Sequence, residues 1–269
     1  MKAATPQNIS MVTNIIETSK WDEVINTLKQ HKLIEFGIDY VKATTLFTGG
    51  HVETVRNPGA FDPSKVEPWT DLAGSGPVLT MMIRQMPVMF EDPPQADDYK
   101  KAKFLMEYLA NAEMPEMFRS RGRGVLKRGL NSLSPNIFLD LCKPGEVYSI
   151  GKIASTSTNQ TNAMKFASDK KGTRYRLLYF LENLDFKGTP IIKASSYPSE
   201  QEVIIGGNIK INSFAFAPIY RGLPKEIKEK YPPAIKDFQQ LIGFVEDVEN
   251  SGLMSDDEVG VAYVYGEIV

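Results

Sequence analysis

The sequence contains few of the residues that metal sites and nucleophilic enzymes usually require. Its 269 residues include only two histidines and one cysteine, which are His31, His51 and Cys142. A zinc site needs about three or four Cys or His ligands, and a Ser or Cys nucleophile is usually activated by a nearby histidine. We read these residues as structural and expect no metal. Any catalysis should therefore depend on carboxylates, hydroxyls, arginines or a bound cofactor.

Long apolar runs and a strong net charge are also missing. No stretch approaches the roughly 18 apolar residues of a membrane-spanning helix, and the first residues lack the apolar core of a secretion signal. The 31 Lys and Arg nearly balance the 33 Asp and Glu, and the net charge of −2 gives no general attraction to nucleic acid or membranes. We expect a protein that acts in the cytoplasm and binds no membrane. Delivery by a machine that needs no cleaved signal stays open.

One local group of basic residues could suggest a nucleic-acid partner. It comprises Arg119, Arg121, Arg123, Lys127 and Arg128. Nucleic-acid sites usually interleave such cations with aromatic residues, which this group does not do. We therefore interpret it as a solvated surface with a phosphate-binding rim, and nucleic acid is not the favoured partner.

The composition is that of an ordinary globular protein, with 42% hydrophobic and 24% charged residues, which is enough to bury a core. In the first half, apolar residues recur at helical spacing. The predicted helices are one capped by Ser19 with Trp21, Val24, Ile25 and Leu28 on its apolar face, one over Val78–Met86 that stops at Pro87, and one that begins near Asp97. The stretch 49–76 is rich in Gly and Pro and is predicted to be irregular.

After Arg123 the sequence changes to short runs of β-branched and aromatic residues, which predict strands. The predicted strands are Val125–Gly129, Glu146–Thr156, Tyr175–Leu181, Pro190–Ala194, Glu202–Ile205, Ile209–Ala217 and Val259–Ile268. Two short helices are predicted among them, Pro135–Leu141 after the cap Ser134 and Gln160–Ala167 after the cap Asn159. No Gly-x-Gly-x-x-Gly follows a strand, so nothing supports a Rossmann site. We predict an α+β fold with a mostly antiparallel core of two packed sheets and an N-terminal helical region.

Three short motifs follow one another in this β-rich half. They are Arg128-Gly129 at the end of a strand, Ser155-Thr156-Ser157 between a strand and a helix, and Glu200-Gln201-Glu202 at the start of a strand. Side chains alternate along a strand, so Glu200 and Glu202 should share one face with their carboxylates about 6–7 Å apart. Two such charges are costly without a positive partner, for which an oxocarbenium ion or a guanidinium is suited.

The other residues offer groups for an anionic ligand. Arg128 has the planar fork that suits phosphate, and Gly129 lets a ligand approach the backbone closely. Ser155 and Ser157 could orient a carboxylate from a neighbouring strand, and Phe166 offers a flat face for an aromatic ring. Each motif alone is weak evidence, since a Ser-Thr-Ser run often only caps a helix. Their order carries the functional hypothesis.

That order resembles the R-S-E motif of the arginine-specific, clostridial-toxin-like mono-ADP-ribosyltransferases, which transfer ADP-ribose from NAD⁺ to a protein and release nicotinamide. The run Glu200–Ile204 and the end Ala262–Val269 look especially like the Mod-type transferases of tailed bacteriophages. The resemblance covers roughly residues 100–269. It implies an ADP-ribosyltransferase domain over residues 96–269 and leaves the helical region 1–95 without an assigned role.

The resemblance implies a role for each matching residue. Glu202 corresponds to the catalytic glutamate that stabilises the oxocarbenium-like transition state, and Ser155 to the serine that orients it. Glu200 corresponds to the glutamate that positions the acceptor guanidinium, and Tyr197 to an aromatic of the loop that contacts the acceptor. The residues implied to bind NAD⁺ are Arg128, Gly129, Thr156, Ser157 and Phe166, with Arg128 at the phosphates and Phe166 against nicotinamide.

The expected enzyme therefore uses NAD⁺ as a substrate, needs no metal and modifies an arginine of a host protein. A phage or a bacterial toxin or effector system would fit, with action in the cytoplasm of the host or target cell, and a cellular pathway stays open as the origin. Two positions depart from the family: Lys127 stands where an aromatic is common, and Gly206-Gly207-Asn208 where a proline is common. An NAD glycohydrolase and a non-catalytic binding module with this fold are the alternatives. A nucleic-acid acceptor is less favoured because Glu200 suits a guanidinium.

Overall fold

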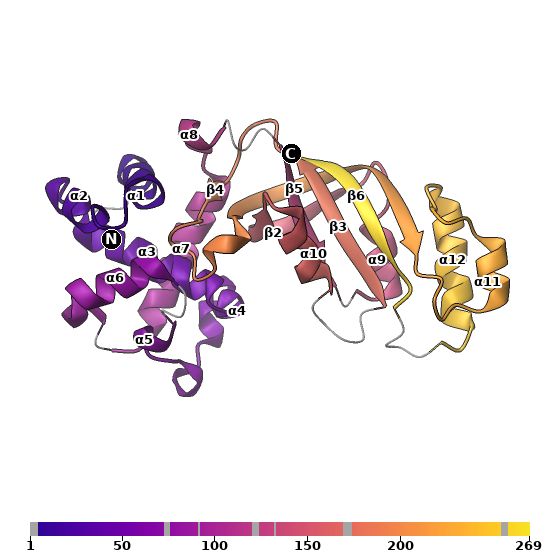
Figure 1. Ribbon diagram of the computed structural model, residues 1–269, viewed down its shortest axis with the longest axis horizontal. Helices are drawn as coiled ribbons and strands as arrows, with labels where there is room; N and C mark the ends of the chain where they lie inside the picture. The colour runs from indigo at the N-terminus through magenta and orange to yellow at the C-terminus, as the bar shows by residue number, and fades with distance from the viewer. Residues whose placement is uncertain are drawn as a thin grey trace. The chain divides into compact units, whose positions relative to one another are not determined.

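The computed structural model describes residues 5–72, 76–90, 92–119, 124–131, 133–168, 174–253 and 258–269 (Figure 1). The basic residues Arg121 and Arg123 therefore lie outside the described part of the chain. The chain divides into two compact units. Unit 1 comprises Met1–Arg119, Lys152–Ala154 and Gly188–Gly206, and unit 2 comprises Ser120–Gly151, Ser155–Lys187 and Gly207–Val269.

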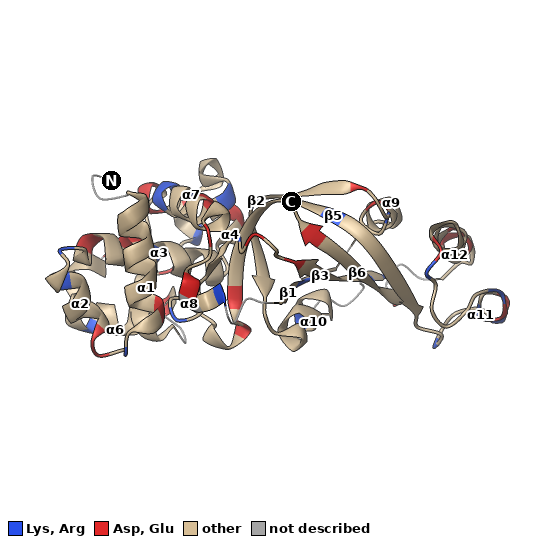
Figure 2. Ribbon diagram, turned by 90° about the horizontal axis from the view of Figure 1, so that it is seen from above, with Lys and Arg blue, Asp and Glu red and all other residues tan. Residues whose placement is uncertain are grey.

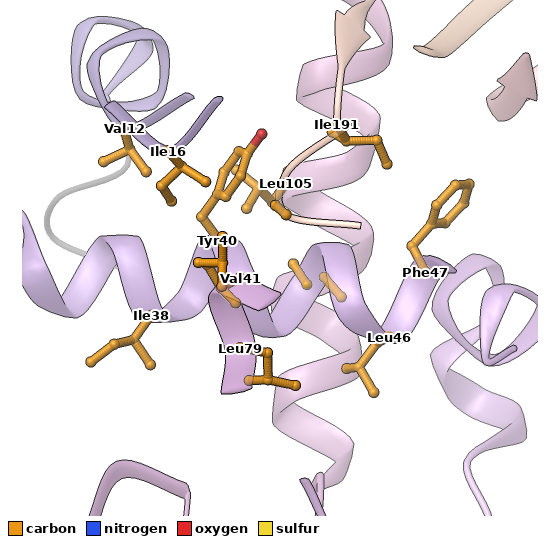
Figure 3. Packing of buried hydrophobic residues seen from close by; sticks show 14 of the residues in the cluster. Val12, Ile16, Ile38, Tyr40, Val41, Leu46, Phe47, Leu79, Leu105 and Ile191 are labelled. Carbon is orange, nitrogen blue, oxygen red and sulfur yellow. The ribbon is translucent and has the colours of Figure 1, made fainter. Parts of the chain in front are cut away.

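Unit 1 is built mainly from helices. They are α1 Pro6–Thr18, α2 Val24–Gln30, α3 Ile34–Thr48, α4 Val52–Arg56, α5 Trp69–Leu72, α6 Pro77–Gln85, α7 Ala96–Asn111 and α8 Glu116–Arg119, with 3-10 turns η1 Pro58–Ala60, η2 Pro63–Lys65 and η3 Pro87–Phe90. The long helices α3 and α7 pack against each other. Tyr40 and Val41 of α3 and Leu105 of α7 belong to one buried hydrophobic cluster (Figure 3). Charges of both signs are interspersed along α7 (Figure 2), where Lys101 Nζ lies 3.5 Å from Asp39 Oδ1 of α3.

Two of the three predicted helices of this region are confirmed, by α6 and α7. The third is misplaced, because α2 begins only at Val24 and follows Glu23. Ser19 instead closes the preceding helix α1, where its backbone N–H donates to the Ile15 carbonyl at 3.0 Å. The stretch 49–76, predicted to be irregular, contains the short helices α4 and α5 as well as two 3-10 turns.

The described residues contain six strands. They are β1 Val125–Leu130, β2 Val147–Ser157, β3 Tyr175–Glu182, β4 Thr189–Pro190, β5 Glu202–Pro218 and β6 Gly260–Ile268. Hydrogen bonds link them in the order β2-β1-β3-β6-β5-β4, and β2 also pairs with β5. The pair β3–β6 is parallel, and the pairs β1–β3, β4–β5 and β5–β6 are antiparallel. The α+β class and the mostly antiparallel pairing are confirmed, although hydrogen bonds join the strands in one sheet where the sequence predicted two.

Two strand predictions need correction. The strand expected over Pro190–Ala194 is limited to β4, and Ile192–Ala194 form a turn instead. The strands expected over Glu202–Ile205 and Ile209–Ala217 are a single strand, β5. A β-carbon on Gly206 would lie 2.6 Å from the backbone oxygen of Lys152. The glycine therefore keeps the strand continuous at a place where it approaches β2 too closely for a side chain.

The helices of unit 2 are α9 Pro135–Asp140, α10 Gln160–Ser168, α11 Lys225–Lys230 and α12 Phe238–Asn250. The two predicted caps are confirmed: Ser134 Oγ accepts from Ile137 N at 3.4 Å, and Asn159 Oδ1 accepts from Thr161 N at 2.8 Å. Helix α10 packs on β1 and β3. The sequence did not predict α11 or α12. On α12, Phe244 packs against Phe216 of β5 with ring centroids 5.1 Å apart.

The predicted catalytic domain begins at residue 96, which is the start of α7. This helix belongs to unit 1, together with the helices before it. The predicted boundary at residue 95 stays a prediction. Within the described residues no helix has the length and apolar character to cross a membrane.

Candidate active site

Arg128 lies within β1 in unit 2, two residues before the strand ends at Leu130. It lies opposite Tyr179 in the antiparallel β1–β3 pair, and the neighbouring Lys127 lies opposite Ser157 of β2. The Nη1 atom of Arg128 donates to the backbone oxygen of Ser155. The structure therefore brings the arginine motif and the Ser-Thr-Ser motif together, while their predicted roles toward NAD⁺ stay predictions.

Close packing requires a glycine at position 129. A β-carbon at this position would lie 2.0 Å from the backbone oxygen of Ala163 and 2.6 Å from the backbone nitrogen of Ala167. Helix α10 thus packs directly on the backbone of β1. The fold requires a glycine here whether or not its backbone also binds NAD⁺.

Replacing Gly129 by Ala should lower the free energy of unfolding by about 3 kcal/mol, because the methyl group forces α10 away from β1. Urea denaturation followed by far-UV circular dichroism measures this effect. Gly124→Ala is the matched control, since no heavy atom lies within 4 Å of a β-carbon there. Equal stability of the two variants would contradict the close packing.

The Ser-Thr-Ser motif forms the end of β2. Ser155 is half-buried, whereas Thr156 and Ser157 are only 3% and 4% exposed. Ser157 Oγ accepts from Asn159 N at 2.9 Å, and Lys127 Nζ donates to the Thr158 carbonyl at 3.1 Å. The hydrogen bond of Ser157 stabilises the turn that leads into α10. Partial burial of Lys127 lowers its pKa. The roles predicted for Thr156 and Ser157 toward NAD⁺ stay predictions.

Phe166 lies on α10, and its side chain is well exposed for an aromatic residue, at 45%. Its carbonyl accepts a hydrogen bond from Asn131 Nδ2 at 2.6 Å, just beyond the end of β1. The helix position of Phe166 is thereby tied to the strand that carries Arg128. An exposed aromatic ring at such a place is available to stack on a planar ligand.

The Glu-x-Glu motif lies in unit 1, and its geometry differs from the prediction. Glu200 ends the 3-10 turn η4 Pro198–Glu200, and Gln201 has left-handed dihedrals of φ 50° and ψ 50°. Strand β5 begins only at Glu202. The prediction that both glutamates alternate along one strand is therefore wrong, because the turn begun by Pro198 interrupts the extended chain before Glu202. The spacing expected along a strand does not apply.

The environments of the two glutamates are different. Glu202 is 5% exposed, and its carbonyl accepts from Ile191 N at 3.0 Å. Beyond it, Val203 and Ile204 pair with Pro190 and Thr189 of β4. Glu200, at the turn, is half-buried. The strand thus holds Glu202 in a buried position, whereas Glu200 is presented by a turn.

Tyr197 begins this turn with half of its side-chain surface exposed. Its backbone N–H donates to Oγ of the buried Ser195 at 2.9 Å.

The predicted site residues are divided between the two units. Unit 2 holds Arg128, Gly129, Ser155, Thr156, Ser157 and Phe166, and unit 1 holds Tyr197, Glu200 and Glu202.

Sequence reasoning missed two residues that contact the chain ahead of Glu200. Glu17 of α1 accepts from the backbone of Lys193, and Thr48 of α3 accepts from Ser196 N at 2.9 Å. Glu17 follows Ile9 by eight residues along α1, which places it on the apolar face of that helix. A charged residue on an apolar helix face was the signal that could have found it.

His51 and Cys142 lie in different units. In unit 1, His51 Nδ1 lies 2.9 Å from the Tyr99 hydroxyl. In unit 2, burial raises the pKa of the Cys142 thiol. Among the residues that the structure describes, His, Cys, Asp and Glu form no group of three or more that could hold a metal ion.

No protein-family model and no curated protein matches the sequence. Among solved structures, the chain is similar to the Vis toxin, an ADP-ribosyltransferase from Vibrio splendidus, with 13% identity over 98% of this chain and 86% of that chain and a TM-score of 0.40. It is similar to the ADP-ribosyltransferase HopU1 of Pseudomonas syringae pv. tomato, with 12% identity over 99% and 98% of the two chains and a TM-score of 0.38. It is also similar to an ADP-ribosyltransferase from Clostridium botulinum, with 13% identity over 93% and 96% of the two chains and a TM-score of 0.39.

Proposed function

We propose that the protein is an NAD⁺-dependent mono-ADP-ribosyltransferase that modifies an arginine of a target protein. The observation that carries the proposal is Glu202, a buried carboxylate at the first position of β5, two residues after the turn-borne Glu200. Burying a carboxylate is costly, and chains keep such groups where a cation or a developing positive charge needs them. The oxocarbenium ion of a ribosyl transfer is such a charge.

The proposed reaction needs no covalent enzyme intermediate. The bond between C1′ of the nicotinamide ribose and the nicotinamide nitrogen breaks, and its electron pair leaves with neutral nicotinamide. A guanidinium nitrogen of the acceptor arginine then bonds to C1′ and releases a proton, which Glu200 accepts. The products are ADP-ribosyl-arginine, nicotinamide and H⁺. Glu202 stabilises the positive charge on the ribose in the transition state.

The residues of unit 2 supply the NAD⁺-binding groups in this proposal. Arg128 contacts the phosphates, and its hydrogen bond to the Ser155 carbonyl of β2 fixes the position of the guanidinium. Phe166 offers an exposed ring for nicotinamide. Ser155 is proposed for the role of the serine that orients the catalytic glutamate, as the resemblance implies. A guanidinium held in place loses less conformational freedom when it binds phosphate.

The acceptor specificity is proposed from the turn that carries Glu200. A half-buried carboxylate on a turn can meet a guanidinium brought by another protein. The exposed Tyr197 at the start of the same turn adds an aromatic surface on which an arginine can stack. Both features favour an arginine acceptor over water.

The decisive experiment incubates the purified protein with biotinylated NAD⁺ and a bacterial lysate, then maps labelled residues by mass spectrometry. Label on arginine supports the proposal. Release of nicotinamide without labelled protein would instead show an NAD glycohydrolase. A protein that neither binds nor cleaves NAD⁺ would be a binding module, and the proposal would fail.

Replacing Arg128 by Lys should raise the dissociation constant for NAD⁺ about tenfold, because an ammonium group lacks the two parallel donors of a guanidinium. Isothermal titration calorimetry measures this change. Arg84→Lys, at an exposed position of α6, makes the same chemical change elsewhere and should leave the constant unaltered. Unchanged binding by the Arg128 variant would remove this residue from the NAD⁺ site.

A further inference from the structure

A buried carboxylate in the N-terminal helices binds the chain segment that leads to Glu200. Glu17 of α1 is 5% exposed. Its Oε2 accepts from Lys193 N at 2.7 Å, and its Oε1 accepts from Ala194 N at 3.2 Å. Both carboxylate oxygens are thus engaged by the backbone of one turn, although the partners lie more than 170 residues apart in the chain.

Groups of α3 and of the link between α1 and α2 hold the same segment. Lys193 Nζ donates to the Ser19 carbonyl at 2.7 Å and lies 5.4 Å from the Trp21 ring centroid. Thr44 Oγ1 donates to the Ala194 carbonyl at 3.3 Å.

Two further contacts fix the ends of this segment. Thr48 Oγ1 accepts from Ser196 N at 2.9 Å. The side chain of Ile191 belongs to the same hydrophobic cluster as Val12 and Ile16 of α1 (Figure 3). Residues 191–196 are therefore fixed to the helices on both the polar and the apolar side.

Glu17 occupies a place that an apolar residue would suit better. Burial raises its pKa from the ordinary 4.5 to about 7, against the opposing effects of the backbone hydrogen bonds and of Lys193. The carboxylate also faces Tyr40 of α3, whose pKa is raised by burial and further by the charge of Glu17. Hydrogen bonds to an ionised group are about twice as strong as those between neutral groups. A charge is costly at this place, but it holds a backbone turn more firmly than a neutral side chain can.

We propose that Glu17 is a positioning residue for the acceptor, acting through Lys193 and Ala194 on the turn that presents Tyr197 and Glu200. This inference rests on the proposed transferase function. It gives the N-terminal helices a role in choosing the acceptor arginine. The backbone of Glu202 is held by Ile191 and by the pairing of β5 with β4 directly after it, and not by Lys193 or Ala194, which Glu17 binds. Loss of the Glu17 carboxylate should therefore impair transfer to arginine more than cleavage of NAD⁺.

The test compares Glu17→Gln with Glu35→Gln, which makes the same change at an exposed position of α3. Transfer is the rate at which biotinylated NAD⁺ labels lysate protein, and hydrolysis is the rate of nicotinamide release by the purified protein alone. In Glu17→Gln, transfer should fall about tenfold while hydrolysis changes less than about threefold. Glu35→Gln should resemble the wild type in both rates.

The pH profile separates positioning from a general structural role. In the wild type, the ratio of transfer to hydrolysis should rise as pH increases through about 7 and Glu17 ionises. In Glu17→Gln this rise should be absent. The amide protons of Lys193 and Ala194 should also exchange faster with deuterium in that variant, which is a readout that needs no activity.

A second variant covers the case in which Glu17→Gln does not fold. Thr48→Val removes the acceptor of Ser196 N from the same segment and should also lower transfer relative to hydrolysis. If the wild type is active and these variants keep its ratio of transfer to hydrolysis, the positioning role alone is wrong. The same conclusion holds if the variants lose both rates equally. A wild type without either activity overturns the proposed function, and the positioning role falls with it.

Discussion

Glu202→Gln should lower both transfer of ADP-ribose and hydrolysis of NAD⁺ by about 10³-fold, because both reactions pass through the same charged ribose. The substitution preserves the size of a side chain that is 5% exposed, so packing changes little. It removes the negative charge from the first position of β5. Binding of NAD⁺ should change by less than about threefold, since the charge acts mainly in the transition state.

Glu200→Gln is the matched comparison. It lies two residues away but on the turn η4, outside the strand. It should lower transfer to arginine about 10²-fold, because the guanidinium loses its proton acceptor, while hydrolysis by water persists. Nicotinamide release and protein labelling, measured in parallel, distinguish the two variants. If Glu200→Gln left transfer unchanged, or if Glu202→Gln kept full hydrolysis, the assigned roles would be wrong.

The sequence predicted the strands of unit 2 well because their signals are local. Strands β1, β2, β3 and β6 are runs of β-branched and aromatic residues bounded by turn residues, and each was placed within about one or two residues. The caps Ser134 and Asn159 are also local signals, and both were correct. Helix α3 was missed because most of its residues are buried, and a helix buried on all sides shows no clear apolar periodicity.

The Glu-x-Glu motif shows where such reasoning fails. Two glutamates ahead of an apolar run indicate an extended strand, and only Pro198 suggested otherwise. The left-handed conformation of Gln201 decides the geometry, and a non-glycine residue rarely adopts it. The motif was found from residue types, whereas the placement of Glu200 depended on a backbone conformation that those types do not encode.

The contact between Glu17 and Lys193 could not be predicted either. It joins residues that are 176 positions apart, and neither residue has a partner that local spacing would indicate. The region 1–95 had no assigned role for the same reason. Helix side chains in this region hold the segment before Glu200 by hydrogen bonds to its backbone. Such contacts depend on the fold and leave no sequence motif.

Glu17 should make unit 1 less stable as pH rises from about 4.5 to about 7. The folded state raises the pKa of this carboxyl group from 4.5 to about 7, so it favours the protonated form. Over this range ionisation of this carboxyl group stabilises the unfolded chain, whereas in the folded chain the group stays protonated. One unit of pKa corresponds to about 1.4 kcal/mol, so this group alone should lower the free energy of unfolding by about 3 kcal/mol. Above about pH 7 its contribution should no longer change.

Glu17→Gln should abolish that part of the pH dependence, because the amide does not titrate. Both tryptophans, Trp21 and Trp69, lie in unit 1, so urea denaturation followed by their fluorescence reports on this unit. Asp39, whose pKa is also raised by burial, is present in both proteins and cancels in the difference between them. A difference in stability that stays constant between about pH 4.5 and 7.5 would contradict the buried, titrating carboxylate. A difference that changes as expected would show that the charge of Glu17, which holds the acceptor turn, lowers the stability of unit 1 at neutral pH. Such a loss of stability is typical of a residue that is kept for function.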